Sequence, residues 1–265
     1  MAAPRIIFVP GGPGFSSRHE AAVLGPRFKA RGWSAHFSDE PWRVDRSTPV
    51  SWDTHVDALA ASIDGLSDVT LVAHSFAVHP VVSAINRLNP RQCRLVLVAP
   101  TLDIPVGHQA VVRLAAKGLS ESDAELTRRM LETAAKSQSL FDAPMQQALG
   151  LAATDPTLFA RYWCDPIAFQ EFAHTLAEPQ NAFDLGSFVA VLSQLAELKW
   201  VLPTAPGCEI LAAVGSGDPV VDAEHTREAL ADWAPQATLE VFAGRGHWLH
   251  LEAPDQFCDF LARHI

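Results

Sequence analysis

Three residues suited to nucleophilic catalysis stand just after three separate apolar runs of strand length: Ser75, Asp218 and His247. A serine hydroxyl is a poor nucleophile at neutral pH unless an imidazole takes its proton, and a carboxylate must fix the tautomer of that imidazole. Because the loops that follow parallel strands open at one edge of a sheet, the sequence predicts that these side chains meet in one cleft.

The turn at Ser75 carries the strongest local signal. The pentapeptide 73–77, Ala-His-Ser-Phe-Ala, joins an apolar, β-branched run to a segment that can form a helix. A turn of this kind, the nucleophile elbow, holds the serine in a strained conformation with its hydroxyl raised above both elements. The small residues Ala73 and Ala77 allow strand and helix to pass closely, although glycine is usual there. The same pattern also arises by chance, so the assignment depends on its partners.

A glycine-rich turn is the first candidate for an oxyanion site. Residues 11–14 read Gly-Gly-Pro-Gly between a strand and a helix. The turn lacks the Lys-Ser/Thr of a phosphate-binding loop and the spacing of a dinucleotide fingerprint. Since Pro13 has no N–H, the backbone N–H groups of Gly12 and Phe76 are the predicted donors to an oxyanion. An ordinary tight turn is the alternative interpretation.

Other residues compete for these roles. Asp103 follows a strong strand and is an alternative to Asp218 as the acid. His74 neighbours the apex serine, so its ring should point away from the hydroxyl and support the site rather than act as its base. We expect His250, three residues beyond His247, to face the helical insertion or solvent, and Asp222 to cap the helix that follows it.

Apolar strands and amphipathic helices alternate through most of the chain, which predicts a parallel sheet with helices on both faces. The predicted strands are 5–9, 32–37, 69–74, 94–100, 208–214 and 238–242, and the predicted helices are 17–30, 52–66, 76–88, 222–233 and 254–263. Residues 42–49 form a predicted polar loop. Pro80 is tolerable because it falls in the first turn of its helix.

The segment 103–203 shows no convincing strand and predicts an all-helical insertion. Its predicted helices are 110–117, 120–137, 143–153, 156–162, 166–177 and 183–200, the second with a capping-box pattern at Ser120 and Asp123. The domain boundaries are therefore 1–102 and 204–265 for the core and 103–203 for a cap. The cap is rich in aromatic side chains that form its own core or roof the cleft; the predicted pocket residues are Phe15, His74, Trp163 and Trp248.

Composition limits the other classes of function. The 265 residues carry a net charge of −10 with no basic stripe, which argues against a nucleic-acid partner. Four scattered cysteines (Cys93, Cys164, Cys208 and Cys258) favour buried, reduced thiols over disulfides or a zinc site. No apolar stretch is long enough for a membrane span. We expect a cytoplasmic protein with a small-molecule substrate and no metal or cofactor, and the sequence leaves a homodimer open.

These motifs together resemble the α/β-hydrolase superfamily. The resemblance rests on the turn 11–14, the pentapeptide 73–77, Gly-Asp-Pro-Val-Val at 217–221 and Gly-His-Trp at 246–248, with Glu252 and Pro254 behind. It covers about residues 5–101 and 205–265, and the order Ser, Asp, His is that of the family. Position 10 is proline where the family usually has histidine, the usual Asp-x-x-Gly-x-Gly loop is replaced by residues 40–43, and two N-terminal strands are missing.

The resemblance implies a doubly wound, mostly parallel α/β fold with an inserted helical cap. It also implies a serine hydrolase of a small or medium apolar ester, thioester, lactone or amide. In that interpretation Ser75 attacks, His247 moves the proton and Asp218 orients the imidazole. Cofactor-free lyases and dioxygenases share this fold and triad, and a non-catalytic ligand-binding protein is a third hypothesis.

Overall fold

Six parallel strands form one sheet in this computed structural model, in the order β2-β1-β3-β4-β5-β6. The strands are β1 (Arg5–Val9), β2 (Ser34–Phe37), β3 (Val69–His74), β4 (Cys93–Val98), β5 (Glu209–Gly215) and β6 (Thr238–Phe242). The structure describes residues 5–12, 14–39, 51–66, 68–88, 93–119, 123–137, 142–153, 157–197 and 201–265. All six predicted strands are present. The predicted loop 42–49 lies outside the described residues.

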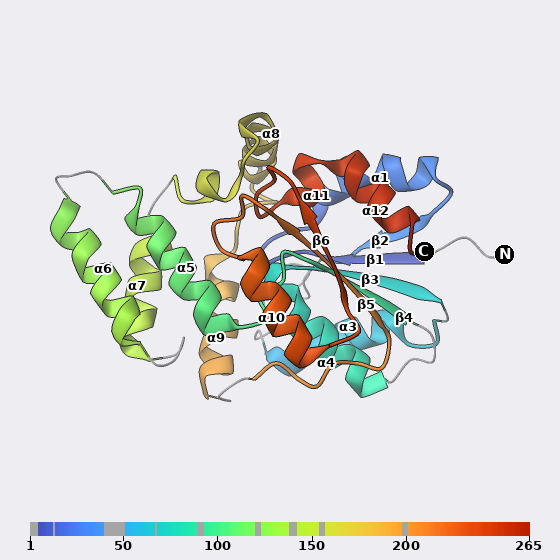
Figure 1. Ribbon diagram of the computed structural model, residues 1–265, viewed down its shortest axis with the longest axis horizontal. Helices are drawn as coiled ribbons and strands as arrows, with labels where there is room; N and C mark the ends of the chain where they lie inside the picture. Colours follow the sequence, from blue (N-terminus) through green and yellow to red (C-terminus); the bar gives the residue numbers. More distant parts are fainter. Residues whose placement is uncertain are drawn as a thin grey trace.

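Helices cover both faces of the sheet, as predicted (Figure 1). One face packs on α1 (Arg18–Ala30), α11 (Leu249–Glu252) and α12 (Pro254–Ala262), and the other on α3 (Trp52–Ile63), α4 (Val78–Leu88) and α10 (Ala223–Trp233). Successive side chains of a strand point to opposite faces. Ile6 and Phe8 of β1 therefore join the core under α1 and α12, whereas Ile7 and Val9 join the core under α3 and α4.

Local capping explains where several helices begin. The Ser51 hydroxyl accepts a hydrogen bond from the Thr54 N–H (3.0 Å) at the start of α3. Asp222 caps α10 as predicted, because its carboxylate accepts from the His225 N–H at 2.8 Å. A short 3₁₀ turn, η1 (Ser75–Ala77), precedes α4, so the predicted helix 76–88 begins two residues later as an α-helix. The short helix α11 was not predicted.

The described residues between β4 and β5 form helices and no strand. They are α5 (Ile104–Ala116), α6 (Ala124–Lys136), α7 (Ala143–Ala153), the 3₁₀ turn η3 (Phe159–Tyr162), α8 (Pro166–Leu176) and α9 (Leu185–Glu197). In Figure 1, α5, α6 and α7 lie together beyond the end of the sheet that carries the carboxyl ends of the strands. The division into a core and a cap at residues 103 and 203 stays a prediction.

Three predicted helices in this segment begin elsewhere, and the one predicted over 156–162 is the 3₁₀ turn η3. The helix predicted over 110–117 begins at Ile104, because the Asp103 carboxylate accepts from the Val106 N–H (3.0 Å) and Pro105 fits the first turn. The helix predicted over 120–137 begins at Ala124, which leaves Asp123 at the N-cap position rather than inside a capping box. Ser120, the other half of that predicted box, lies outside the described residues.

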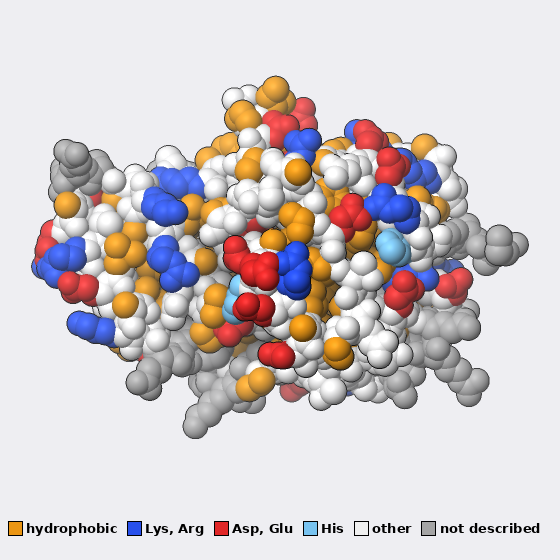
Figure 2. All heavy atoms as spheres, in the orientation of Figure 1, with side chains coloured by type: hydrophobic (Ala, Val, Ile, Leu, Met, Phe, Trp, Pro, Cys, Tyr) orange, Lys and Arg blue, Asp and Glu red, His pale blue; other side chains and the backbone are white. Residues whose placement is uncertain are grey.

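The surface carries mixed charges on the face that Figure 2 shows, with acidic side chains gathered over α10. Among the described residues, no helix is both long enough and apolar enough to cross a bilayer. The cysteines are free thiols, but only Cys258 is buried. The expectation of buried thiols was therefore wrong for Cys164, which is exposed where the chain passes the loop after β5.

Candidate active site

The strand β3 turns into a helix at Ser75 with the backbone of a nucleophile elbow. Ser75 has φ +53°, a left-handed conformation that a non-glycine residue adopts only under strong constraint. Ala73 and Ala77 on either side are buried. The strain is therefore located at the one residue whose hydroxyl is predicted to react.

Ser75, His247 and Asp218 are joined by hydrogen bonds, as their positions after three strands predicted. His247 Nε2 lies 2.9 Å from Ser75 Oγ, and His247 Nδ1 lies 2.8 Å from Asp218 Oδ2. The Asp218 side chain is fully buried and that of His247 is 4% exposed. Since a carboxylate only accepts hydrogen bonds, Asp218 places the proton on Nδ1 and leaves Nε2 free to accept the serine proton.

Backbone groups hold the Asp218 carboxylate in place. Its Oδ1 accepts from the N–H groups of Val220 (2.8 Å) and Val221 (3.0 Å), so Oδ2 is left for His247. Gly215, at the end of β5, lies so close to the loop before His247 that a Cβ there would stand 2.1 Å from the Arg245 carbonyl oxygen. The approach that brings Asp218 to His247 therefore requires glycine at position 215.

A buried glutamate anchors the loop that carries His247. Glu252 accepts from the Gly246 N–H (3.0 Å) with one oxygen and from the Cys164 N–H (2.9 Å) with the other. The His247 N–H donates to the Tyr162 carbonyl oxygen at 2.8 Å. Two of these contacts involve Tyr162, the last residue of η3, and Cys164, two residues beyond it, so the helical segment is hydrogen-bonded to the loop that bears the imidazole. The sequence did not predict this anchor, although Glu252 was part of the motif.

Asp103 does not occupy the acid position. Its exposed carboxylate caps α5, whereas the Asp218 carboxylate bonds to His247. The residue near Asp103 that does reach the site is Thr101, whose hydroxyl lies 3.3 Å from Ser75 Oγ. No signal in the sequence marked Thr101, because a lone threonine after a strand is common.

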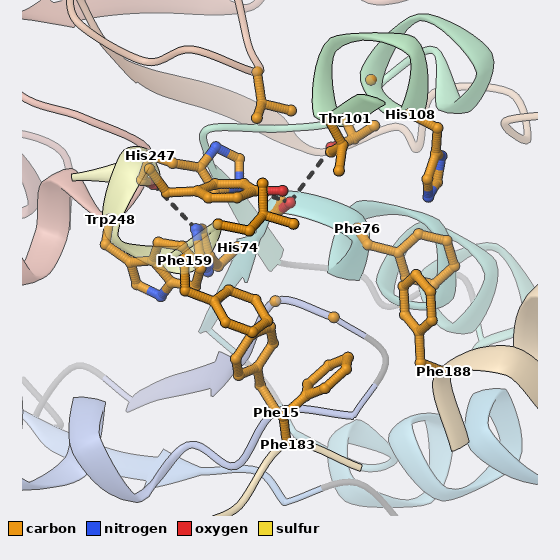
Figure 3. Close-up of a pocket in the computed structure, with 18 of the residues that line it drawn as sticks. Phe15, His74, Phe76, Thr101, His108, Phe159, Phe183, Phe188, His247 and Trp248 are labelled. Atoms are coloured by element: carbon orange, nitrogen blue, oxygen red, sulfur yellow. Dashed lines mark hydrogen bonds between the residues drawn. The ribbon is translucent and has the colours of Figure 1, made fainter. Parts of the chain in front are cut away.

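A cavity of about 140 Å³ opens beside Ser75 (Figure 3). Aromatic side chains dominate its wall: Phe15, Phe76, Phe159, Tyr162, Phe183, Phe188 and Trp248. Phe15, His74 and Trp248 line it as predicted. Trp163 does not; it stacks on the far side of Trp248, with ring centroids 5.2 Å apart and planes 4° from parallel. Trp163 therefore supports the wall from behind.

The chain's relationships agree with this geometry. The sequence profile of the alpha/beta hydrolase family matches residues 6–260, nearly the whole chain. The chain is an α/β hydrolase. None of the curated proteins compared with it matches in sequence.

Solved structures of similar fold include hydrolases of several kinds. An esterase from Exiguobacterium antarcticum has a TM-score of 0.62 at 15% identity, over 99% of this chain and 92% of its own. A thermophilic esterase from Thermogutta terrifontis has 0.58 at 14%, over 99% and 89%. The meta-cleavage product hydrolase CumD from Pseudomonas fluorescens has 0.51 at 20%, over 99% and 90%. At these sequence identities, the likeness between the present chain and these structures shows the fold alone.

The glycine-rich turn of this hydrolase lies against the same cavity. Gly12 has φ +124°, a region that glycine alone enters readily, and both Gly12 and Phe76 line the cavity next to Ser75. Gly11 packs on His74: a Cβ at position 11 would stand 2.7 Å from His74 Nδ1. The turn therefore approaches the elbow closely enough for both predicted oxyanion donors to border one space.

Behind the His247 backbone, three buried titratable side chains form a second group, here called the back cluster: Glu20, His74 and His250. Each is at most 2% exposed. His74 Nε2 lies 3.1 Å from the His247 carbonyl oxygen, to which it must donate, and His250 Nε2 stands 3.8 Å from Glu20 Oε1. The expectation that His250 faces the insertion or solvent was wrong, because its ring packs between Phe8 and Phe257.

The back cluster is short of partners. Within the described part of the chain, Glu20 Oε2, His74 Nδ1 and both ring nitrogens of His250 make no hydrogen bond. One atom from each side chain lies within 4.8 Å of the others, so the three could share a metal ion or a hydrogen-bond network. Burial lowers the pKa of His74 and of His250, and the nearby Glu20 carboxylate acts in the opposite direction on His250.

Proposed function

We propose that this α/β hydrolase is a serine-dependent hydrolase of small or medium apolar esters, thioesters, lactones or amides. The observation that carries the proposal is the unbroken chain of hydrogen bonds from Asp218 through His247 to Ser75, with the serine in a strained turn beside a cavity. Strain at the nucleophile is retained only where the surrounding structure enforces it, and it clusters at functional sites.

In the first half of the proposed reaction, Ser75 Oγ attacks the substrate carbonyl carbon while its proton passes to His247 Nε2. Asp218 stabilises the imidazolium that forms, and the N–H groups of Gly12 and Phe76 stabilise the oxyanion. The proton on Nε2 then goes to the leaving oxygen, sulfur or nitrogen as its bond to the carbonyl carbon breaks. An acyl-enzyme on Ser75 remains.

In the second half, a water molecule replaces the departed group. His247 takes a proton from the water, whose oxygen attacks the acyl carbon, and the same proton returns to Ser75 Oγ as the ester bond breaks. The products are a carboxylic acid and the regenerated serine. Thr101, 3.3 Å from Ser75 Oγ, is placed to support the resting position of the serine hydroxyl.

The cavity supports an apolar substrate with one ring or a short chain. Its volume is 140 Å³. An apolar protein cavity of about 150 Å³ takes up one benzene molecule. Residues Phe159, Phe183 and Phe188 reach it from the segment between β4 and β5. We therefore assign that segment the role of a cap that completes the substrate pocket. The esterases among the structural relatives are consistent with an ester substrate.

The decisive experiment treats the protein with a fluorophosphonate probe and a panel of p-nitrophenyl esters. Wild-type protein should be labelled and should turn the esters over, whereas Ser75→Ala should lose labelling and lose kcat by about 10⁴-fold or more, because the triad acts as a unit. Ser83→Ala is the matched control; Ser83 lies on α4 and its hydroxyl donates to the His79 carbonyl oxygen.

The other outcomes point to different functions. Full turnover of the natural substrate by Ser75→Ala would contradict the acyl-enzyme and support a cofactor-free lyase or dioxygenase. Tight binding of small molecules by wild-type protein, with neither labelling nor turnover, would support a ligand-binding protein.

A further inference from the structure

One polar side chain in the cavity wall has no part in the proposed triad. His108 lies on α5, and its Nδ1 is 2.9 Å from the Ile104 carbonyl oxygen one turn earlier. A carbonyl can only accept, so the ring proton of the neutral imidazole is on Nδ1. Nε2 therefore presents a lone pair, and within the described part of the chain no group donates to it.

His108 is held in this state by burial. The side chain is 9% exposed, and desolvation lowers its pKa to about 4. The ring is therefore uncharged at neutral pH. An uncharged imidazole with Nδ1 already donating can hydrogen-bond to a ligand only as an acceptor, through Nε2.

Thr101 and Gly107 connect the position of His108 to that of Ser75. The Thr101 hydroxyl lies 3.3 Å from Ser75 Oγ, and the Thr101 methyl group packs on Gly107, where a Cβ would stand only 2.5 Å from it. This close approach brings α5 to the floor of the site and places the next residue, His108, on the cavity wall. Figure 3 shows its ring entering the space above Phe76 and Phe188.

We infer that His108 forms a subsite that selects substrates with a hydrogen-bond donor, an O–H or N–H, on the ring or chain that fills the cavity. The inference rests on the proposed function and adds the class of substrate: a hydroxylated arylalkanoate ester is its simplest member. The aromatic wall accepts the ring, and Nε2 accepts the proton of its hydroxyl group.

The discrimination should be strong because the acceptor is surrounded by apolar side chains. A ligand without a donor removes water from Nε2 and leaves the lone pair unpaired, which should weaken its binding by about tenfold to a hundredfold. Sites that hydrogen-bond a substrate hydroxyl reject analogues that lack it far more strongly than apolar pockets reject a missing methylene. A methoxy group is larger than a hydroxyl and brings a second acceptor in place of the donor, so it should be disfavoured.

The test measures kcat/KM by acid release for three kinds of methyl ester of 3-phenylpropanoic acid. They carry a hydroxyl, a methoxy group or hydrogen on the ring, and the ortho, meta and para isomers are compared. In wild-type protein the hydroxyl ester should exceed the methoxy ester by about tenfold or more for at least one isomer. The ratio of kcat/KM for the hydroxyl ester to that for the methoxy ester is measured on wild-type protein alone. A ratio near one for all three isomers would overturn the inference.

Two substitutions test whether His108 causes the preference for the hydroxyl ester. His108→Leu should bring the ratio close to one, and His108→Gln, whose side-chain carbonyl restores an acceptor, should recover part of it. A ratio that survives in His108→Leu would overturn the inference. Fluorophosphonate labelling of Ser75 confirms that each variant is folded. If wild-type protein shows neither labelling nor turnover of any ester, the proposed function fails and the inference fails with it; turnover without discrimination defeats the inference alone.

Discussion

The residue His247 separates two regions of opposite character. In front of its backbone, the group here called the front cluster (Ser75, His247 and Asp218) has both ring nitrogens of the imidazole hydrogen-bonded. Behind its backbone, the back cluster of Glu20, His74 and His250 is as deeply buried, yet His250 has no hydrogen bond on either ring nitrogen within the described residues. Among the described residues, the hydrogen bond that connects the two clusters runs from His74 to the His247 carbonyl oxygen.

The difference shows that a buried group of titratable side chains is not necessarily a hydrogen-bonded one. Buried polar groups are hydrogen-bonded in most native structures, so unpaired ones need an explanation. In the proposed reaction, the imidazole of the front cluster needs two fixed partners because a proton moves between Ser75 and His247. The back cluster needs only the contact of His74 with the His247 backbone, and its unpaired atoms reduce the stability of the fold at the same place where the reactive turn is strained.

Asp218→Asn should produce the largest effect on activity, because it disrupts the hydrogen bond between Asp218 and His247 in the front cluster. The amide keeps an oxygen for the N–H groups of Val220 and Val221, so the loop should survive. Its NH₂ group would stabilise the wrong tautomer of His247, and kcat/KM should fall about 10⁴-fold. Ester hydrolysis and the thermal unfolding midpoint check this. A loss below about tenfold with an unchanged midpoint would mean that another carboxylate orients the imidazole.

The back cluster should reveal itself through acid instability. Burial lowers the pKa of His74 and of His250. Unfolded histidines titrate near pH 6.5, so below that pH the unfolded chain binds protons that the folded chain refuses. Stability is complete above pH 6.5 and is lost as the pH falls below it, by up to about 1.4 kcal/mol per pH unit for each of these two groups.

His250→Phe sharpens this second prediction. The ring site between Phe8 and Phe257 accepts an aromatic side chain, with centroids 5.3 and 5.9 Å away, and the substitution removes one buried titratable group. Urea unfolding at pH 7, 6 and 5 should show a flatter decline for the variant than for wild-type protein. If the free energy of unfolding declines with pH equally in the variant and in wild-type protein, the back cluster is not the source of the acid sensitivity. Ester hydrolysis should be little changed in His250→Phe, because the front cluster is intact.

The front cluster could be predicted from the sequence, because its three members follow three strands and the order of parallel strands brings such positions to one edge. The sheet was predicted for the same reason: apolar, β-branched runs bounded by turn residues have few other structures. The prediction of the triad depends on these two regularities, whereas its exact geometry also requires the close approach at Gly215 and the anchor at Glu252.

The back cluster could not be predicted in this way. Glu20 and His250 are polar residues on helices whose apolar spacing gives no reason to bury them, and their contact depends on how α1 and α11 pack on one face of the sheet. Trp163 was misplaced for a similar reason, since aromatic composition does not tell the first layer of a pocket wall from the second. The helix α5 begins earlier than predicted because Asp103 is its N-cap.

Asp103→Ala should have the smallest effect, and it tests whether the assignment of the acid is right. Asp103 is exposed, follows β4 as Asp218 follows β5, and caps α5 through the Val106 N–H. Losing that cap should lower the free energy of unfolding by about 1 kcal/mol. The hydrogen bond between Asp218 and His247 is untouched, so kcat/KM should stay within about twofold of wild type, measured with the same ester as for Asp218→Asn. A loss of activity as large as that of Asp218→Asn would place a working carboxylate at position 103 and would require the front cluster to rearrange during the reaction.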